Sequence, residues 1–297
     1  MAEAAILVTG GTGQLALALE KAASVPVRRV GRPGFDFDHP ETIEAAFRAA
    51  APSLVVNAAA YTAVDAAEDD KEAAYRANRD GPAELARLCA AAGIPLIHIS
   101  TDYVFDGAKP TPYDESDAVS PQGVYGASKL AGEDAVLASG ALAIVLRTSW
   151  VYSSTGRNFV RTMLALGRTR DRLTVVADQT GCPTAADDLA EVVLAIAARI
   201  RAGGWDDGYG GVFHAAGTGS TTWYGLAAAV FEEAARHGAK VPQVAPIATA
   251  DWPTRARRPA NSRLDCTRLS DVFGLRLPPW RTSLARTIDT IFASNQV

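Results

Sequence analysis

The stretch Ile6-Leu7-Val8-Thr9-Gly10-Gly11-Thr12-Gly13-Gln14-Leu15-Ala16 decides the fold of this chain. A short apolar run ends in a turn with the spacing G-x-x-G-x-x-A from Gly10, and a helical stretch follows. Glycines at Gly10 and Gly13 permit a tight turn and let backbone N–H groups approach a pyrophosphate at the positive end of the helix. The small Ala16 lets helix and strand pack closely. The segment therefore predicts the start of a nucleotide-binding βαβ unit.

Apolar, β-branched runs alternate with alanine-rich helical stretches through the first half of the chain. The expected strands are residues 5–9, 27–30, 54–58, 96–100 and 143–148. The expected helices are residues 14–23, 41–50, 68–77, 82–92 and 125–138. Runs that are apolar throughout are typical of strands covered on both faces. Their strict alternation with helices predicts an α/β fold with a doubly wound parallel sheet, the Rossmann fold.

The pattern changes after Trp150. Further elements are expected as a helix at 158–166, a strand at 173–176, a helix at 185–202 and a strand at 212–215. The last third is rich in Pro, Arg and Trp. We expect residues 1–150 to form an NAD(P)-binding Rossmann domain whose sheet is completed by parts of 185–220. Residues 151–184 and 221–297 are expected to form a smaller, C-terminal substrate-binding domain.

Composition excludes several classes of protein. The chain has 297 residues, 48% of them hydrophobic, and a formal net charge of −4. These values argue against disorder and provide no basic field for nucleic acid. There is no uninterrupted apolar run of about 18 residues, and Glu3 stands where a signal peptide carries positive charge. We therefore expect no membrane span and no signal peptide.

The cysteines and histidines indicate neither disulfides nor a metal site. Cys89, Cys182 and Cys266 are widely spaced, with no C-x-x-C pair, which is typical of thiols in a reducing compartment. The predicted location is the cytoplasm. The four histidines are scattered and form no metal-ligand cluster.

The end of the second strand predicts the cofactor. No acid stands there to hold a ribose 2′-hydroxyl, whereas Arg32, with Arg29 nearby, suits a 2′-phosphate. We expect NADPH to be preferred, with NADH also accepted. Asp36 and Phe37, in the loop that follows, are candidates for the adenine end of the cofactor.

Three residues predict the chemistry. Thr101 ends the fourth strand, and Tyr125 and Lys129 lie four residues apart on one face of a helix. A lysine ammonium beside a phenol is expected to lower the tyrosine pKa towards working pH. A tyrosine so placed can protonate a ketone oxygen while hydride reaches the carbon, and a threonine hydroxyl can bond the same oxygen.

This combination resembles the extended short-chain dehydrogenase/reductase superfamily and, within it, the dTDP-4-dehydrorhamnose reductases. The resemblance rests on Asn57-Ala58-Ala59-Ala60-Tyr61-Thr62-Ala63-Val64-Asp65, Ser100-Thr101-Asp102-Tyr103-Val104-Phe105, Arg147-Thr148-Ser149-Trp150-Val151-Tyr152 and Arg257-Arg258-Pro259-Ala260-Asn261-Ser262-Arg263-Leu264. These segments span nearly the whole chain. Ala16 departs from the commoner glycine, and Tyr61 from a frequent histidine.

The resemblance implies the last step of dTDP-L-rhamnose synthesis, in which NADPH reduces C4 of dTDP-4-dehydro-L-rhamnose. Tyr125 would be the acid, Lys129 would tune it and hold the nicotinamide ribose, and Thr101 would orient the carbonyl. The matching cofactor positions are Gly13, Gln14, Leu15, Ala60, Tyr61 and Thr62. The matching substrate positions are Thr101, Asp102, Trp150, Arg258, Asn261 and Arg263. A homodimer is a family-level expectation, and a role for magnesium stays open.

Two alternatives remain from the residues. Thr101-Asp102-Tyr103 lacks the second carboxylate of the Thr-Asp-Glu that sugar-nucleotide dehydratases carry, but an epimerase or another sugar-nucleotide reductase would use the same triad. A non-catalytic, NADP-binding regulatory subunit, like the β subunit of methionine adenosyltransferase, is the alternative from another class. The acids Asp65, Glu68, Asp69, Asp70 and Glu72 are expected to favour a helix dipole and to face water.

Overall fold

The computed structural model describes residues 5–294, and its centre is a six-stranded sheet in which all neighbouring strands are parallel. Along the sheet the order is β10-β5-β4-β3-β1-β2. These strands are β1 (Ile6–Thr9), β2 (Val27–Val30), β3 (Leu54–Asn57), β4 (Leu96–Thr101), β5 (Ala143–Thr148) and β10 (Gly211–His214). The order reverses at β1, and ligands of doubly wound proteins bind at such a reversal, beyond the carboxyl ends of the strands. The predicted fold class is confirmed.

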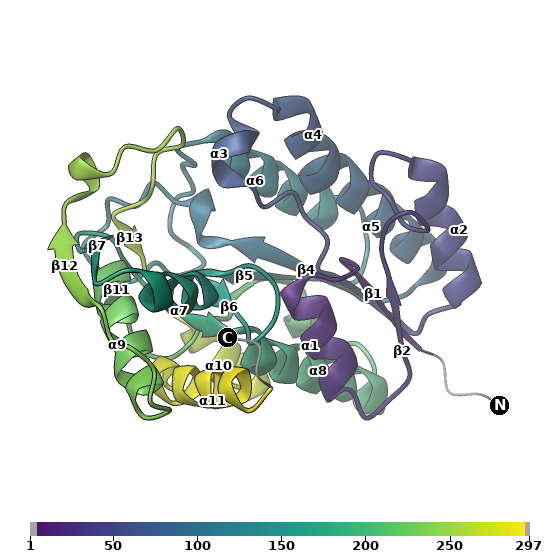
Figure 1. Ribbon diagram of the computed structural model, residues 1–297. Helices are drawn as coiled ribbons and strands as arrows, with labels where there is room; N and C mark the ends of the chain where they lie inside the picture. The colour runs from purple at the N-terminus through teal and green to yellow at the C-terminus, as the bar shows by residue number, and fades with distance from the viewer. Residues whose placement is uncertain (1–4, 295–297) are drawn as a thin grey trace.

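Helices cover both faces of the sheet (Figure 1). One face carries α1 (Gln14–Ala22), α8 (Ala186–Gly203) and α10 (Thr267–Phe273), and the other carries α2 (Pro40–Ala50), α5 (Gly81–Ala92) and α6 (Val124–Leu137). Successive side chains of a strand point to opposite faces. Accordingly, Ile6 and Val8 pack in the first core while Leu7 packs in the second.

The segment after β3 differs from the prediction. The structure has α3 (Val64–Ala67), α4 (Lys71–Tyr75) and a π-helical turn η1 (Arg76–Asp80) that runs directly into α5. The predicted helix start at Glu68 and the predicted break before Pro82 are therefore wrong. Asp70 caps α4 by accepting a bond from the Ala73 N–H. The wider π turn lets the helix continue into Pro82, whose missing N–H and ring would disrupt a regular α-helix.

A second body of structure lies beside the carboxyl end of the sheet, on the left of Figure 1. Its core is built by α7 (Phe159–Thr169), α9 (Trp223–Ala235) and α11 (Trp280–Ala293), together with β7 (Arg172–Val176), which pairs in parallel with β12 (Gln243–Ile247). The short strands are β6 (Val151–Tyr152), β8 (Thr180–Gly181), β9 (Thr184–Ala185), β11 (Thr221–Thr222) and β13 (Asn261–Ser262). The 3-10 turns are η2 (Asp102–Val104), η3 (Asp207–Tyr209) and η4 (Thr249–Asp251).

The predicted division into two domains stays a prediction. The structure adds that Leu269 and Phe273 of α10, within the predicted substrate domain, pack in the core of the large sheet. Within residues 5–294, no helix is both long and apolar enough to cross a membrane. Glu3, which bears on the absence of a signal peptide, lies outside the described residues.

Candidate active site

The glycine turn after β1 is wedged between two other strand ends. Gly10 has φ +109°, and a Cβ there would lie 2.9 Å from the carbonyl oxygen of Ala58, just after β3. A Cβ on Gly31, just after β2, would lie 2.5 Å from the Cα of Gly11. Only glycine fits these approaches, so the backbone N–H groups at the start of α1 are left accessible to an anion.

The residues after the turn have different surroundings. The Gln14 carboxamide oxygen accepts a bond of 2.9 Å from Asn158, the residue that caps α7, so the turn is tied to the second body. Leu15 is buried in the core beneath α1. Their roles in cofactor binding stay predictions.

The adenine end is rich in ion pairs. Arg32, whose side chain is 68% exposed, bonds Asp36 at 2.9 Å and Asp38 at 2.7 Å. Arg29 donates to Glu20 and to the Gly11 carbonyl oxygen. A 2′-phosphate at Arg32 would therefore have to displace carboxylates.

Phe37 does not face the surface of this region. Its side chain is buried, and a Cβ on Gly81 would lie 2.1 Å from its ring. Phe37 thus packs against Gly81, the first residue of α5. Its predicted role stays untested.

Asn78, which was not predicted from the sequence, joins the loop after β3 to α6, the helix that carries Tyr125. Its side chain is fully buried; it accepts from the Tyr61 N–H at 2.8 Å and donates to the Tyr61 carbonyl oxygen at 3.1 Å. It also donates to the Ser128 hydroxyl at 3.0 Å. The predicted cofactor stretch of Ala60, Tyr61 and Thr62 is therefore held against α6.

Two glycines let α6 approach its neighbours. A Cβ on Gly126 would lie 2.1 Å from the Tyr103 carbonyl oxygen, and one on Gly132 would lie 1.9 Å from that of Asn78. This packing brings Tyr125, in the first turn of α6, to the end of β4. There the Thr101 hydroxyl, which donates to Asp102 at 3.1 Å, lies beside the phenol of Tyr125.

The pKa values of this site differ from the expectation. Burial raises the pKa of Tyr125 to about 12, the hydrogen bond from Thr101 opposes this, and the charge of Asp102 adds to it. The predicted lowering by Lys129 is therefore wrong. The Lys129 ammonium instead donates to the Ile99 carbonyl oxygen at 2.6 Å. Tyr125 is held protonated, which is the form required of an acid.

Lys129 is itself perturbed. Its side chain is buried, and burial lowers its pKa to about 8, although Glu133 one helical turn later opposes the change. Glu133 is buried too and forms an ion pair with Arg147 of β5, with a shortest distance of 2.6 Å. Ser100 also bonds Glu133. Arg147, a lone charge inside the apolar run of β5, was the sequence signal for this buried pair.

The predicted sugar positions lie at the carboxyl ends of β4 and β5, which are neighbours. Asp102 is 4% exposed, its Oδ2 atom has no hydrogen-bond partner among the described residues, and burial raises its pKa to about 6. Trp150 has φ +49° and stacks on Trp223 with a centroid distance of 3.6 Å. A Cβ on Gly181 would lie 2.4 Å from the Trp150 indole. Trp223, at the start of α9, thus supports the Trp150 ring from the second body.

Comparison with known proteins identifies the family. A family model described as "RmlD substrate binding domain" matches residues 4–292. A dTDP-4-dehydrorhamnose reductase of Sinorhizobium fredii (strain NBRC 101917 / NGR234) is 48% identical over 285 residues, covering 95% of this chain and 96% of that protein. The chain belongs to the dTDP-4-dehydrorhamnose reductase family.

Solved structures of the family share this fold. The enzyme of Clostridium acetobutylicum ATCC 824 has a TM-score of 0.88 and 37% identity, covering 97% of this chain and 99% of that one. The enzyme of Bacillus anthracis str. Ames, solved in complex with NADP, has the same TM-score and coverage with 32% identity. The predicted family and the predicted class of NAD(P)H-dependent oxidoreductase are confirmed, and the NADP complex of this relative agrees with the predicted cofactor.

The arginine segment that carries part of the family resemblance is bonded to acids. Arg258 pairs with Asp65 at 2.6 Å, and Arg255 pairs with Asp69 at 2.5 Å. Both carboxylates face water as predicted, with side chains that are 44% and 49% exposed, but each also pairs with an arginine that the prediction did not foresee. The sequence around α3 could not predict these ion pairs, because the two arginines lie about 190 residues later in the chain.

The last two predicted substrate residues of the family motif support a loop. Asn261 is buried and donates to the carbonyl oxygens of Lys109 and Thr111, each at 2.7 Å. Arg263 donates to Asn261 at 2.8 Å and to the Pro110 carbonyl oxygen. Direct contact of either residue with substrate stays a prediction. Within residues 5–294, no group of His, Cys, Asp and Glu could hold a metal ion.

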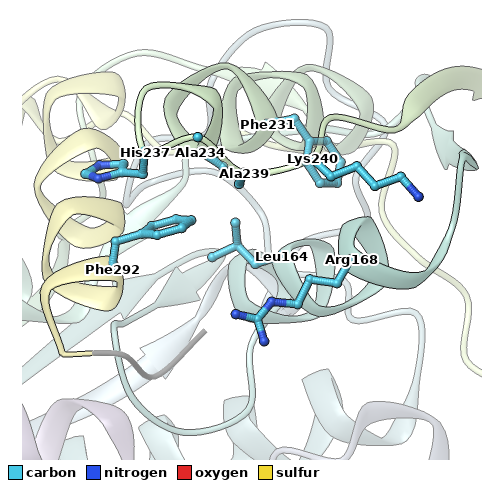
Figure 2. A pocket seen from close by; sticks show the side chains of 9 residues that line it. Leu164, Arg168, Phe231, Ala234, His237, Ala239, Lys240 and Phe292 are labelled. Carbon is cyan, nitrogen blue, oxygen red and sulfur yellow. The ribbon is translucent and has the colours of Figure 1, made fainter.

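A separate cavity of about 270 Å³ lies between α7, α9 and α11 (Figure 2). Its apolar wall includes Leu164 and Phe292, and His237 stacks on Phe292 with a centroid distance of 4.6 Å. Lys240 points away from it and pairs with Asp171 at 2.7 Å. None of the predicted site residues lines this cavity.

Proposed function

We propose that this chain reduces the C4 ketone of dTDP-4-dehydro-L-rhamnose with NADPH, forming dTDP-L-rhamnose for cell-surface polysaccharide. The observation that carries the proposal is the meeting of Thr101 and Tyr125 at the carboxyl edge of the sheet, in a chain of this reductase family. The same edge carries the glycine turn, which lies two strands away from β4. A dinucleotide held there has its reactive end within the reach of α6.

The glycine turn fits the cofactor. Because any side chain at Gly10 would collide with the backbone after β3, the turn stays open to a pyrophosphate. NADPH supplies the hydride that reaches C4. The residues of the chain then have to protonate the ketone oxygen and to orient the sugar so that the hydride reaches C4.

Tyr125 carries the proton in this proposal. Its raised pKa keeps the phenol protonated until the ketone oxygen gains negative charge. Thr101 stabilises the phenolate that results, since its hydroxyl can turn from the Asp102 carboxylate and donate to the Tyr125 oxygen. Lys129, one turn later on the same helix face, would hold the nicotinamide ribose with its ammonium.

The proposed substrate contacts are of two kinds, those to the sugar and those to the diphosphate. The buried Asp102 Oδ2 atom, which no residue in 5–294 bonds, can accept a sugar hydroxyl, and the Trp150 ring can pack on a sugar face. Arg258 can bind the diphosphate after exchanging its bond to Asp65. We also propose that the protein is located in the cytoplasm and forms a homodimer. All three cysteines are free thiols, as a reducing compartment requires.

The test compares the wild-type chain with Tyr125→Phe by following NADPH absorbance with dTDP-4-dehydro-L-rhamnose generated in the same tube. We expect rapid oxidation by the wild type and a loss of about 100-fold or more in kcat in the variant, the scale of general acid catalysis. If a folded, NADPH-binding wild type shows no oxidation, the proposal fails. A regulatory subunit, or an enzyme that acts on another sugar nucleotide, then becomes the better explanation.

A further inference from the structure

The catalytic helix is capped by a residue from a distant element. The Glu68 Oε1 atom accepts a hydrogen bond of 2.8 Å from the Val124 N–H, the first N–H of α6 and the one preceding Tyr125. Gly123, the residue at the cap position, provides no side chain of its own. The first N–H groups of a helix lack partners within the helix, and a carboxylate there also meets the positive end of the helix dipole. Glu68 therefore fixes the turn that carries the proposed acid.

The fit around this cap is close. A Cβ on Gly123 would lie 2.7 Å from the Glu68 Oε1 atom, so glycine is the residue that leaves room for the carboxylate. Gly123 has φ −154°, an extended conformation that any residue adopts. An alanine at this position would thus push on Glu68 without straining its own backbone.

The same short segment holds the arginine loop. Asp65, three residues before Glu68, accepts bonds from the Arg258 guanidinium at 2.6 Å and from the Ala256 N–H at 3.0 Å. Burial raises the pKa of Asp65, but the bonds from Ala256 and Arg258 outweigh it and the pKa is lowered overall. Figure 1 shows this loop returning from β12 beside α3 and α6. Residues 64–69 thus lie between the proposed acid and the proposed diphosphate contact.

We propose that Glu68 is a positioning residue for the reduction: its carboxylate holds the first turn of α6 so that the Tyr125 hydroxyl stays at Thr101, while Asp65 on the same segment holds Arg258. The inference rests on the proposed function. It adds a residue that touches neither substrate nor cofactor and acts through the backbone of α6. A shift of about 1 Å in a reacting group can cost on the order of 100-fold in rate.

Glu68→Ala is the main variant, and it removes the cap. We expect kcat to fall about 10-fold or more, with KM for NADPH within about twofold of the wild type, because the glycine turn is unchanged. Glu68→Gln keeps an oxygen acceptor and should restore most of kcat. Gly123→Ala, which leaves Glu68 in the chain, should reproduce the loss.

Asp70→Ala is the matched control. Asp70 also caps a helix, accepting from Ala73 in α4, but it makes no bond to α6. Loss of either cap should lower the thermal midpoint by similar amounts. Only Glu68→Ala should lower kcat. If both variants lower kcat equally, or if Glu68→Ala keeps kcat within twofold, Glu68 is only a structural cap and the inference is wrong.

Amide hydrogen exchange separates this inference from the reductase assignment. In Glu68→Ala, the peptide that contains residues 123–127 should exchange faster than in the wild type, whereas Asp70→Ala should leave it unchanged. This readout needs no substrate. Faster exchange in Glu68→Ala together with an inactive wild type would support the hold of Glu68 on α6 and overturn the proposed function. Unchanged exchange in Glu68→Ala would overturn the role of Glu68.

Discussion

At the scale of the residue, the candidate site depends on charges held inside the protein. The Lys129 ammonium is buried beside a carbonyl oxygen, and Tyr125 remains a neutral phenol next to Thr101. Both are the ordinary states near pH 7, but the pKa of each group is shifted from its usual value. Burial penalises the charged form of each group, which raises the pKa of a phenol and lowers that of an ammonium.

Lys129 predicts the alkaline limit of activity. Its pKa is lowered to about 8, so the ammonium is present below that pH and is lost as the pH rises through it. If the charged form is the one that holds the nicotinamide ribose, kcat/KM should be level near pH 7 and fall above about pH 8, by up to tenfold per pH unit. A kcat/KM profile that stays level to about pH 9.5, in a protein shown to remain folded by circular dichroism, contradicts the role.

Arg32 predicts the choice of cofactor. Arg32→Ala should raise KM for NADPH about 10-fold and leave KM for NADH within about twofold, because a charge-assisted bond contributes about 1.5–3 kcal/mol and Arg32 must first leave Asp36 and Asp38. Arg28→Ala is the control, since Arg28 donates to the Ala49 carbonyl oxygen instead. Equal rises in KM for both cofactors would argue against contact with a 2′-phosphate.

At the scale of the element, α6 is held from three sides. Gly126 packs on η2, Gly132 packs on the π turn, and Glu133 forms its ion pair with Arg147 in β5. Arg147 also lies over the Phe105 ring, with its guanidinium carbon 5.1 Å from the centroid. The helix that carries the proposed acid is therefore placed by contacts along its whole length.

Glu133→Gln should cost about 3–5 kcal/mol in the free energy of unfolding, because it leaves the Arg147 charge buried and unpaired. Urea unfolding measures it. The exposed pair of Glu44 and Arg48 is the control, and Glu44→Gln should cost about 0.5 kcal/mol or less. The double variant Glu133→Leu/Arg147→Met should recover much of the loss, since apolar residues often replace a buried pair without cost. Equal losses for the two single variants would contradict this account.

At the scale of the whole molecule, the two bodies meet at stacked tryptophans. Trp150 follows β5 of the large sheet, and Trp223 begins α9 of the second body. Phe159 of α7 lies against Trp223 with a centroid distance of 4.7 Å. The wall proposed to face the sugar thus depends on how the two bodies pack.

Trp223→Ala should therefore affect binding and stability together. We expect a loss of about 3 kcal/mol in the free energy of unfolding, at the lower end for aromatic core residues, since Trp223 is only partly buried. KM for the sugar nucleotide should rise about fivefold or more as Trp150 loses its support, while KM for NADPH should not change. Trp252→Ala, at a side chain that is 60% exposed, should alter stability by about 0.5 kcal/mol or less. An unchanged KM for the sugar nucleotide would exclude Trp150 from the sugar site.

The sequence by itself determined the sheet, the glycine turn and the three residues of the proposed chemistry. Each of these is encoded locally: β-branched runs indicate strands, glycine spacing indicates the turn, and a separation of four residues puts Tyr125 and Lys129 on one helix face. The family followed from the same short segments.

Only the tertiary structure decided which charges meet. Glu68 reaches the start of α6, Asp65 reaches Arg258, and Glu133 reaches Arg147, and each partner belongs to another element. The pKa of Tyr125 also rose where spacing predicted a fall, because burial outweighs a neighbouring charge that is directed elsewhere. Sequence spacing reports which residues share a face, whereas partner choice and desolvation are set by the order of the strands and the packing of helices on them.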